Sequence, residues 1–155
     1  KSQTNGEHMK KVVALISVVL LTLSAQPAQA ATKVTVLNPS KVSTKTGLVT
    51  LTVSGLPTTK GIYISQCMGI DKATNQPSAC NPAQSSKLWV SNLPADQKMG
   101  AKPGKGKLTL KVDKYFKDGD CIHTKCIIYV SNDHNATDKT FSQAIPFKFG
   151  GINLF

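Results

Sequence analysis

The stretch LVTLTVSGLPTTKGIYISQC, residues 48–67, contains the pattern that determines the fold. In its first half the apolar residues Val49, Leu51 and Val53 alternate with polar ones, and the second half repeats this alternation. A period of two in runs rich in Val, Ile and Thr is typical of β-strands that bury one face. The GLPTTKG segment between the halves has the composition of a turn. The stretch therefore predicts two successive strands.

The same alternation recurs along the rest of the chain. Five further runs show it, at residues 33–37, 87–91, 107–113, 126–132 and 144–149. Loops rich in Gly, Pro, Asn and Asp separate them. Pro146 lies inside the last run, and because proline has no N–H to donate, that strand must be at a sheet edge or contain a bulge. Seven short strands without an amphipathic helix predict an all-β fold, a seven-stranded antiparallel Ig-like β-sandwich.

The N-terminal residues have the pattern of an export signal. Residues 1–8 precede a methionine and fit no fold pattern, so we interpret them as a vector remnant or an over-extended N-terminus. Residues 9–30 combine two lysines, a twelve-residue apolar run and an Ala-Gln-Ala ending, which together predict a signal peptide. The run is short for a hydrocarbon layer of ~30 Å, so a membrane anchor is the weaker alternative. We therefore expect a secreted domain at residues 31–155 without a transmembrane anchor.

The charge of the chain is strongly positive. Residues 31–155 contain sixteen lysines, seven aspartates, no Arg and no Glu, which gives a formal net charge of +9. Such a charge favours anionic partners, namely nucleic acid, anionic lipid or a polyanionic cell envelope, and the alternative is a solvated lysine-rich surface that serves solubility alone. The lysines are scattered, and the densest group lies in one Gly- and Pro-rich turn, at Lys98, Lys102, Lys105 and Lys107. Because this turn has no aromatic residue for stacking and no Arg fork, we expect any polyanion binding there to be weak.

The four cysteines of the chain are expected to form disulfides. An exported protein meets an oxidising compartment, where four cysteines usually make two bridges. Three pairings are possible, and the local one, Cys67–Cys80 with Cys121–Cys126, is the simplest. A zinc site built from these cysteines with a histidine is the alternative, although thiolate sites belong mostly to reducing compartments.

Candidate metal and catalytic residues are few. His123 or His134 would be the histidine of such a zinc site. The acidic residues at 118–120 and 133–138 lie in turn-like segments, and the second lacks the Gly and terminal Glu of a calcium loop. Neither a nucleophile motif nor a zinc-protease motif is present, and a carboxylate pair would need two Asp. We therefore predict no metal, no cofactor and no enzymatic activity.

Six short motifs give the sequence a family resemblance. They are VSGLP (53–57), YISQC (63–67), ACNPA (79–83), DC followed by a cysteine after four residues (120–126), VSND (130–133) and AIPF (144–147). In this order, and with both cysteine spacings, the chain resembles the neocarzinostatin family, secreted actinobacterial apoproteins that carry enediyne chromophores. The resemblance implies an Ig-like sandwich, local disulfides that match Cys67–Cys80 and Cys121–Cys126, and a cleft that shields a DNA-cleaving chromophore.

The resemblance also points to candidate ligand-binding residues. Family position suggests Gln66, Met68, Ser131 and Asp133, and the need for apolar contact adds Trp89, Tyr115 and Phe116. The chain differs from family carriers at Gly69 and at residues 84–86, where the carriers have aromatic residues. It also differs in charge, because the known carriers are acidic.

The sequence thus predicts a secreted, monomeric, non-enzymatic protein of neocarzinostatin type. It would sequester a small apolar or aromatic ligand non-covalently, an enediyne-like chromophore by resemblance, and so have an antibiotic or antimicrobial role with DNA as the chromophore's target. The alternative is a basic exported interaction protein that binds an anionic cell envelope or DNA without a small ligand.

Overall fold

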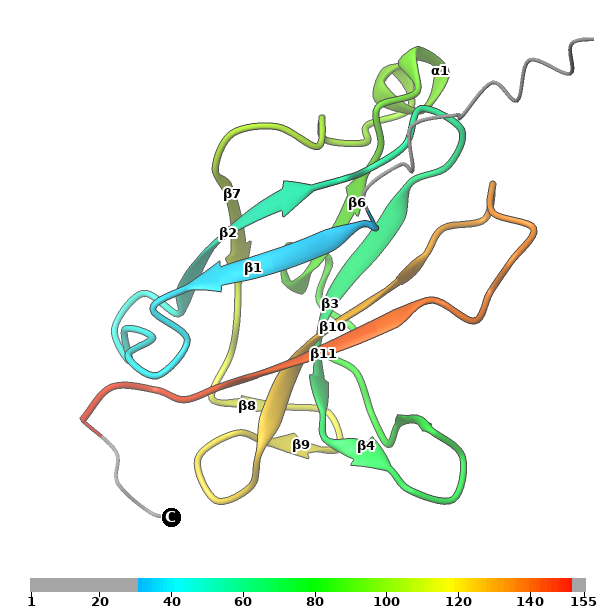
Figure 1. The fold of residues 1–155 in the computed structure, drawn as a ribbon. Helices are drawn as coiled ribbons and strands as arrows, with labels where there is room; N and C mark the ends of the chain where they lie inside the picture. Colours follow the sequence, from blue (N-terminus) through cyan, green and yellow to red (C-terminus); the bar gives the residue numbers. More distant parts are fainter. Residues whose placement is uncertain (1–30, 152–155) are drawn as a thin grey trace, which may run out of the picture.

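The computed structural model describes residues 31–151, and these residues form two antiparallel sheets packed face to face (Figure 1). The vector remnant and signal peptide predicted at residues 1–8 and 9–30 lie outside the described residues, as do residues 152–155.

Seven long strands build the two sheets. The three-stranded sheet has the order β1 (Lys33–Leu37), β2 (Leu48–Ser54), β7 (Leu108–Lys111). The four-stranded sheet has the order β11 (Ser142–Phe147), β10 (Cys126–Asn132), β3 (Ile62–Met68), β6 (Lys87–Val90). All seven predicted strands are present, and the prediction of an antiparallel sandwich is confirmed. Pro146 lies in β11, which is an edge strand as expected.

The core lies between the sheets and follows the alternation of the sequence. Val49 and Leu51 of β2 face Ile62 and Ile64 of β3 across the sandwich, together with Ile128 of β10, and all five are at most 2% exposed. Burial of each such side chain stabilises the fold by about 1.5–3 kcal/mol. The residues between them on β3 and β10 therefore point to the opposite face of the four-stranded sheet.

The structure also contains short elements that the sequence pattern did not predict. They are β4 (Ile70–Asp71), β5 (Gln76–Pro77), η1 (Gln84–Ser86), α1 (Pro94–Lys98), β8 (Tyr115–Phe116) and β9 (Gly119–Asp120). Figure 1 shows α1 at one end and β4, β8 and β9 at the other. Helix α1 begins with Pro94, a residue suited to the first helical position because its missing N–H would have no partner there.

Both local disulfides are present. Cys67 is bonded to Cys80 and Cys121 to Cys126, which confirms the predicted pairing. Because all four sulfurs are used in these bonds, none is left as a thiolate for a zinc ion.

One side chain joins the edges of the two sheets. Gln143 of β11 accepts a hydrogen bond from the backbone N–H of Val34 over 3.0 Å, and its amide donates to the Val34 carbonyl over 2.7 Å. Val34 belongs to β1, the edge strand of the three-stranded sheet. The amide of Gln143 thus satisfies both backbone groups of Val34 in the way a neighbouring strand would.

Candidate ligand-binding face

The outward side of the four-stranded sheet carries a row of polar and aromatic side chains. The strand register places Tyr63 of β3 between Trp89 of β6 and Ser131 of β10. The next outward row consists of Lys87, Ser65 and Tyr129. We call these six residues the outer face.

Three rings gather at one end of the outer face. The ring centroids of Trp89 and His134 are 5.0 Å apart, those of Tyr63 and His134 are 6.1 Å apart, and those of Tyr63 and Trp89 are 6.3 Å apart. These separations are in the range at which aromatic rings attract one another. Tyr63 is 36% exposed, Trp89 is half-buried and His134 is exposed, so the group, which we call the aromatic cluster, presents ring surface to solvent.

A buried carboxylate fixes the tryptophan of this cluster. The indole N–H of Trp89 donates a hydrogen bond of 2.9 Å to Oδ2 of Asp133, which is 1% exposed. Oδ1 of Asp133 accepts a hydrogen bond from the backbone N–H of Asn135 over 3.0 Å. The backbone N–H of Asp133 donates to the carbonyl of Gly61 over 3.0 Å. Because Asp133 is almost completely buried, it can affect a ligand only by positioning Trp89 and the neighbouring backbone.

A second buried carboxylate extends this network. Asp96 of α1 is 3% exposed and accepts hydrogen bonds from Oγ of Ser91 over 2.6 Å and from Nδ2 of Asn135 over 2.9 Å. Nδ2 of Asn135 also lies 3.5 Å from Oδ2 of Asp133. The loop after β10, which carries His134, is thus tied to α1 and to β6 by hydrogen bonds to two charged acceptors.

Tyr63 and His134 are also joined through polar atoms. The hydroxyl of Tyr63 lies 2.5 Å from Nδ1 of His134. Burial raises the pKa of the Tyr63 hydroxyl above its usual value, and the charge of Asp133 adds to this effect. The protonated hydroxyl can donate to Nδ1, which leaves the ring proton of a neutral His134 on Nε2, available to a ligand.

The β4–β5 hairpin bounds the other end of the outer face. The Cys67–Cys80 disulfide attaches this hairpin region to the outward side of β3. The hydroxyl of Tyr129 donates to Oε1 of Gln76 in the hairpin over 3.2 Å. Between the hairpin and the aromatic cluster lies the row of Lys87, Ser65 and Tyr129, of which Lys87 is exposed and the other two are half-buried.

The structure brings three of the predicted ligand residues together, and these are Trp89, Ser131 and Asp133. Gln66 lies on the inward side of β3 and is fully buried. Its amide donates to the carbonyl of Asp113 over 2.7 Å and accepts from Nδ2 of Asn81 over 2.8 Å and from the backbone N–H of Asp113 over 2.9 Å. Gln66 therefore holds the interior of the sandwich together.

The other three predicted residues lie away from the aromatic cluster. Met68 is half-buried, with its sulfur 3.7 Å from that of Cys126. Tyr115 and Phe116 form strand β8 of the β8–β9 hairpin, beside the Cys121 backbone, and Tyr115 is 58% exposed. The ring of Phe116 covers Gly119, where an added Cβ would overlap it.

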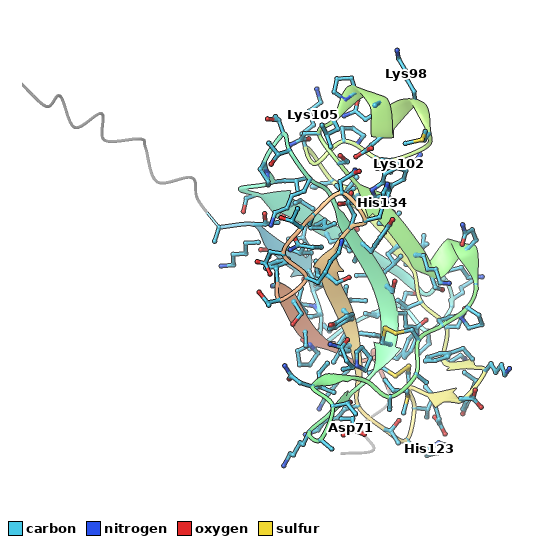
Figure 2. All side chains as sticks on the ribbon, turned by 90° about the vertical axis from the view of Figure 1, so that its right-hand side faces the viewer. Asp71, Lys98, Lys102, Lys105, His123 and His134 are labelled. Atoms are coloured by element: carbon cyan, nitrogen blue, oxygen red, sulfur yellow. A yellow bond between two sulfur atoms is a disulfide. The ribbon has the colours of Figure 1, made fainter. Side chains whose placement is uncertain are left out.

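The four predicted polyanion-binding lysines are exposed; Lys98 is the last residue of α1, and Lys102 pairs with Val90 of β6. The backbone N–H of Lys102 donates to the carbonyl of Trp89 over 2.8 Å, which fixes the turn of residues 98–107 against that strand. Figure 2 shows Lys98, Lys102 and Lys105 at the same end of the molecule as His134, and Asp71 and His123 at the opposite end. We call residues 98–107 the basic turn.

No metal-binding group is found within residues 31–151, where no three His, Cys, Asp or Glu side chains are suitably grouped. His123 instead pairs with Asp120, its Nδ1 lying 2.8 Å from Oδ2. This hydrogen bond lowers the pKa of the Asp120 carboxyl. No helix in the same part of the chain is long and apolar enough to cross a membrane.

Comparison with known proteins finds similarity among solved structures. No family model and no curated protein matches the chain. Among solved structures, macromomycin matches over 77% of this chain and 99% of its own, at 21% identity and a TM-score of 0.49.

Proposed function

We propose that the protein is a secreted, non-enzymatic binding protein that holds a flat aromatic ligand on its outer face. The observation that carries this proposal is the partly exposed aromatic cluster of Tyr63, Trp89 and His134. A ring that is already held in one orientation loses little freedom when a ligand stacks on it. Trp89 meets this condition, because its N–H is bound to the buried Asp133 carboxylate.

The chemistry of the outer face defines the ligand class. Each ring-on-ring contact stabilises a complex by about 0.5–1.5 kcal/mol beyond simple burial, so a polycyclic body suits this end of the face. The hydroxyls of Ser65 and Ser131 offer hydrogen bonds next to the rings, and Lys87 offers a positive charge. We therefore propose a polycyclic ligand with polar or anionic substituents, bound non-covalently.

The resemblance to the neocarzinostatin family suggests a finer assignment. An enediyne-type chromophore is a polycyclic ligand of this class, and a carrier of one would have an antibiotic role with DNA as the chromophore's target. The aromatic surface proposed here comes from Tyr63, Trp89 and His134, whereas the positions at which family carriers have aromatic residues are occupied here by Gly69 and residues 84–86.

Titration of the full chain with a panel of polycyclic aromatic compounds tests the proposal. Trp89 is the only tryptophan of the chain, so quenching of its fluorescence reports binding at the cluster directly. His134→Ala removes one exposed ring and should weaken binding by up to about tenfold, the equivalent of one stacking contact. His123→Ala is the matched control, since it removes an exposed histidine at the opposite end (Figure 2). A panel that quenches nothing, or equal losses in both variants, would refute the proposal.

A second candidate function is polyanion binding through the basic turn. It is favoured by the position of the turn, whose lysines are exposed and whose Lys102 is hydrogen-bonded to the strand that carries Trp89. Lysine contacts with phosphate release counterions and carry no base information. If three or four lysines touch one duplex, the log–log dependence of affinity on salt should have a slope of about −3 to −4.

Neutralising the basic turn tests this second function. The triple variant Lys102→Gln, Lys105→Gln, Lys107→Gln should reduce the magnitude of the salt slope by about two to three units. A control triple of equal charge, Lys72→Gln, Lys117→Gln, Lys125→Gln, should retain most of the slope. Equal effects of the two triples would mean that net charge alone is responsible, and an absence of binding to DNA and heparin at low salt would eliminate the function.

A further inference from the structure

A second candidate site lies at the opposite end of the molecule from the aromatic cluster. A pocket of about 340 Å³ opens there, and we call it the end pocket. It is lined by Pro39, Ser40, Cys121, Ile122, Thr124, Lys125, Cys126, Pro146, Phe147, Lys148 and Phe149. Ile122 and Thr124 flank His123, which Figure 2 shows at the far end from His134. The end pocket therefore shares no residue with the outer face.

The inner wall of the end pocket is apolar. Ile122, Phe147 and Phe149 are at most 8% exposed, and the rings of Phe147 and Phe149 meet edge to face with centroids 5.8 Å apart. The Cys121–Cys126 disulfide and Pro146 add further apolar surface. The volume is close to the lower end of the range of roughly 300–1,000 Å³ in which proteins hold small molecules. A body of one or two fused rings, or a short alkyl chain, would fill it.

The walls are held in place without a ligand. The backbone N–H of Lys148 donates to the carbonyl of Pro39 over 2.7 Å, and the backbone N–H of Val42 donates to the carbonyl of Lys148 over 3.0 Å. The Gly150 N–H donates back to Val42 over 2.7 Å, and the disulfide closes the 121–126 loop. A ligand would thus enter a preformed pocket, so little binding free energy would be lost to ordering the protein.

The charges that line the end pocket have one sign. Lys125 and Lys148 are exposed members of the lining, and the lining contains no carboxylate. The nearby Asp120 is engaged by His123. An apolar wall with two cationic groups is complementary to a molecule that has an apolar body and one anionic group.

We propose that the end pocket binds a small monoanionic amphiphile. Its apolar body lies against Ile122, Phe147 and Phe149, and its carboxylate or sulfonate lies beside Lys125 and Lys148. This site is independent of the ligand proposed for the outer face.

Two probes that share one apolar body test the apolar contact and the ionic contact of this proposal separately. Anilinonaphthalenesulfonate carries the anionic group, and N-phenylnaphthylamine is the corresponding neutral molecule. The full chain should bind the sulfonate in a saturable 1:1 complex. Amide resonances of Thr124, Lys148 and Phe149 should shift on binding, and those of Tyr63 and Trp89 should not.

Variants then assign the roles of the lining residues. Lys125→Gln with Lys148→Gln should weaken binding of the sulfonate by about five- to tenfold, since each exposed ionic contact contributes only modestly. The same pair of changes should alter the affinity of the neutral probe by less than about twofold. Lys102→Gln with Lys105→Gln, which removes equal charge at the other end, should leave both affinities unchanged. Ser40→Trp, at an exposed position of the lining, should weaken both probes by about tenfold or more because the new ring fills the pocket.

Three results would overturn the proposal. The first is the absence of saturable binding of the sulfonate. The second is a set of amide shifts centred on the aromatic cluster. The third is an equal loss of sulfonate affinity in the Lys125/Lys148 and Lys102/Lys105 variants, which would mean that net charge alone causes the effect.

Discussion

The indole N–H of Trp89 and the buried carboxylate of Asp133 form a hydrogen bond of 2.9 Å that joins β6 to the loop after β10. The bond fixes the orientation of Trp89, the largest ring of the outer face, and it is one of the hydrogen bonds that the buried Asp133 carboxylate accepts. Because Asp133 is only 1% exposed, loss of a partner cannot be replaced by bulk water without local opening. Stability and the proposed ligand binding are therefore linked at this pair.

Removal of the indole N–H should destabilise the fold. Trp89→Phe leaves Oδ2 of Asp133 with only the distant Nδ2 of Asn135, at 3.5 Å. We expect a loss of about 1.5–3 kcal/mol in the free energy of unfolding, the usual value for a hydrogen bond to a charged group. Urea unfolding followed by circular dichroism measures it.

A double-mutant cycle isolates the hydrogen bond from the change of ring size. Combination of Trp89→Phe with Asp133→Asn should cost at least about 1 kcal/mol less than the sum of the single changes. Tyr129→Phe, which removes an exposed hydroxyl that contacts Gln76, serves as the control and should cost about 0.5 kcal/mol. Additive single changes would show that the Trp89–Asp133 bond contributes nothing specific.

The space beside Asp133 admits no side chain at Gly61. A Cβ added there would lie 2.5 Å from Oδ2 of Asp133 and 2.5 Å from the Val90 carbonyl oxygen. Gly61→Ala should therefore lower the free energy of unfolding by about 2–3 kcal/mol through overpacking. Gly69→Ala is the matched control, because its Cβ would approach only the carbonyl of Lys125, at 3.6 Å, and its cost should be about 0.5 kcal/mol or less. Similar thermal unfolding of the two variants would contradict this prediction.

The raised pKa of Tyr63 makes stability fall at alkaline pH. Below the usual tyrosine pKa of 10.0, the hydroxyl is protonated in both the folded and the unfolded chain, so its contribution to the free energy of unfolding is fully present. As the pH rises above that value, the unfolded chain loses its proton first and the free energy of unfolding decreases. The decrease stops once the pH has passed the folded-state pKa, and the lost stability is not regained. Tyr63→Phe should flatten this decline in urea unfolding measured between about pH 8 and pH 11.

Absorbance of tyrosinate gives an independent check on Tyr63. The difference between the alkaline titrations of the wild-type chain and Tyr63→Phe should have a midpoint above 10.0. A midpoint at or below that value would mean that burial and the charge of Asp133 do not act on this hydroxyl.

The two disulfides should differ in their effect on stability, because they close loops of different length. Cys67 and Cys80 are 13 positions apart, and Cys121 and Cys126 are 5 positions apart. In the chain-entropy description, removal of the first bond by a double Cys→Ala change should cost about 3 kcal/mol, and removal of the second about 2 kcal/mol. Non-reducing peptide mapping should recover only these two pairs, and a Cys67–Cys121 or Cys67–Cys126 peptide would contradict the structure.

The strands were predictable because their pattern is local. The alternation in residues 48–54 and 62–68 depends only on which side chains enter the core, and Pro146 marks an edge by its missing N–H. Helix α1 was not predicted because it has five residues and owes its place to contacts of Asp96 with Ser91 and Asn135. Such short elements depend on tertiary contacts that a periodicity cannot reveal.

The aromatic cluster was predicted only in part. Trp89 could be placed on the outward side of its strand, and Tyr63 is marked by the same alternation, as an outward aromatic residue between Ile62 and Ile64. His134 had no such signal, because it reaches the cluster through a loop. Gln66, which family position suggested as a ligand residue, is fully buried and forms hydrogen bonds with both backbone groups of Asp113.

The amide of Gln143 has a consequence for how the molecule behaves beside other copies of itself. A bare strand edge invites another chain to add a strand, which is the first step of aggregation. The backbone groups of Val34 on the edge strand β1 are already occupied by Gln143, the edge strand β11 contains Pro146, and Lys102 pairs with the free side of β6 at Val90. Three of the four edges of the two main sheets are thus closed to strand addition at these points, and Gln143→Ala should raise the tendency of the concentrated protein to form fibrils.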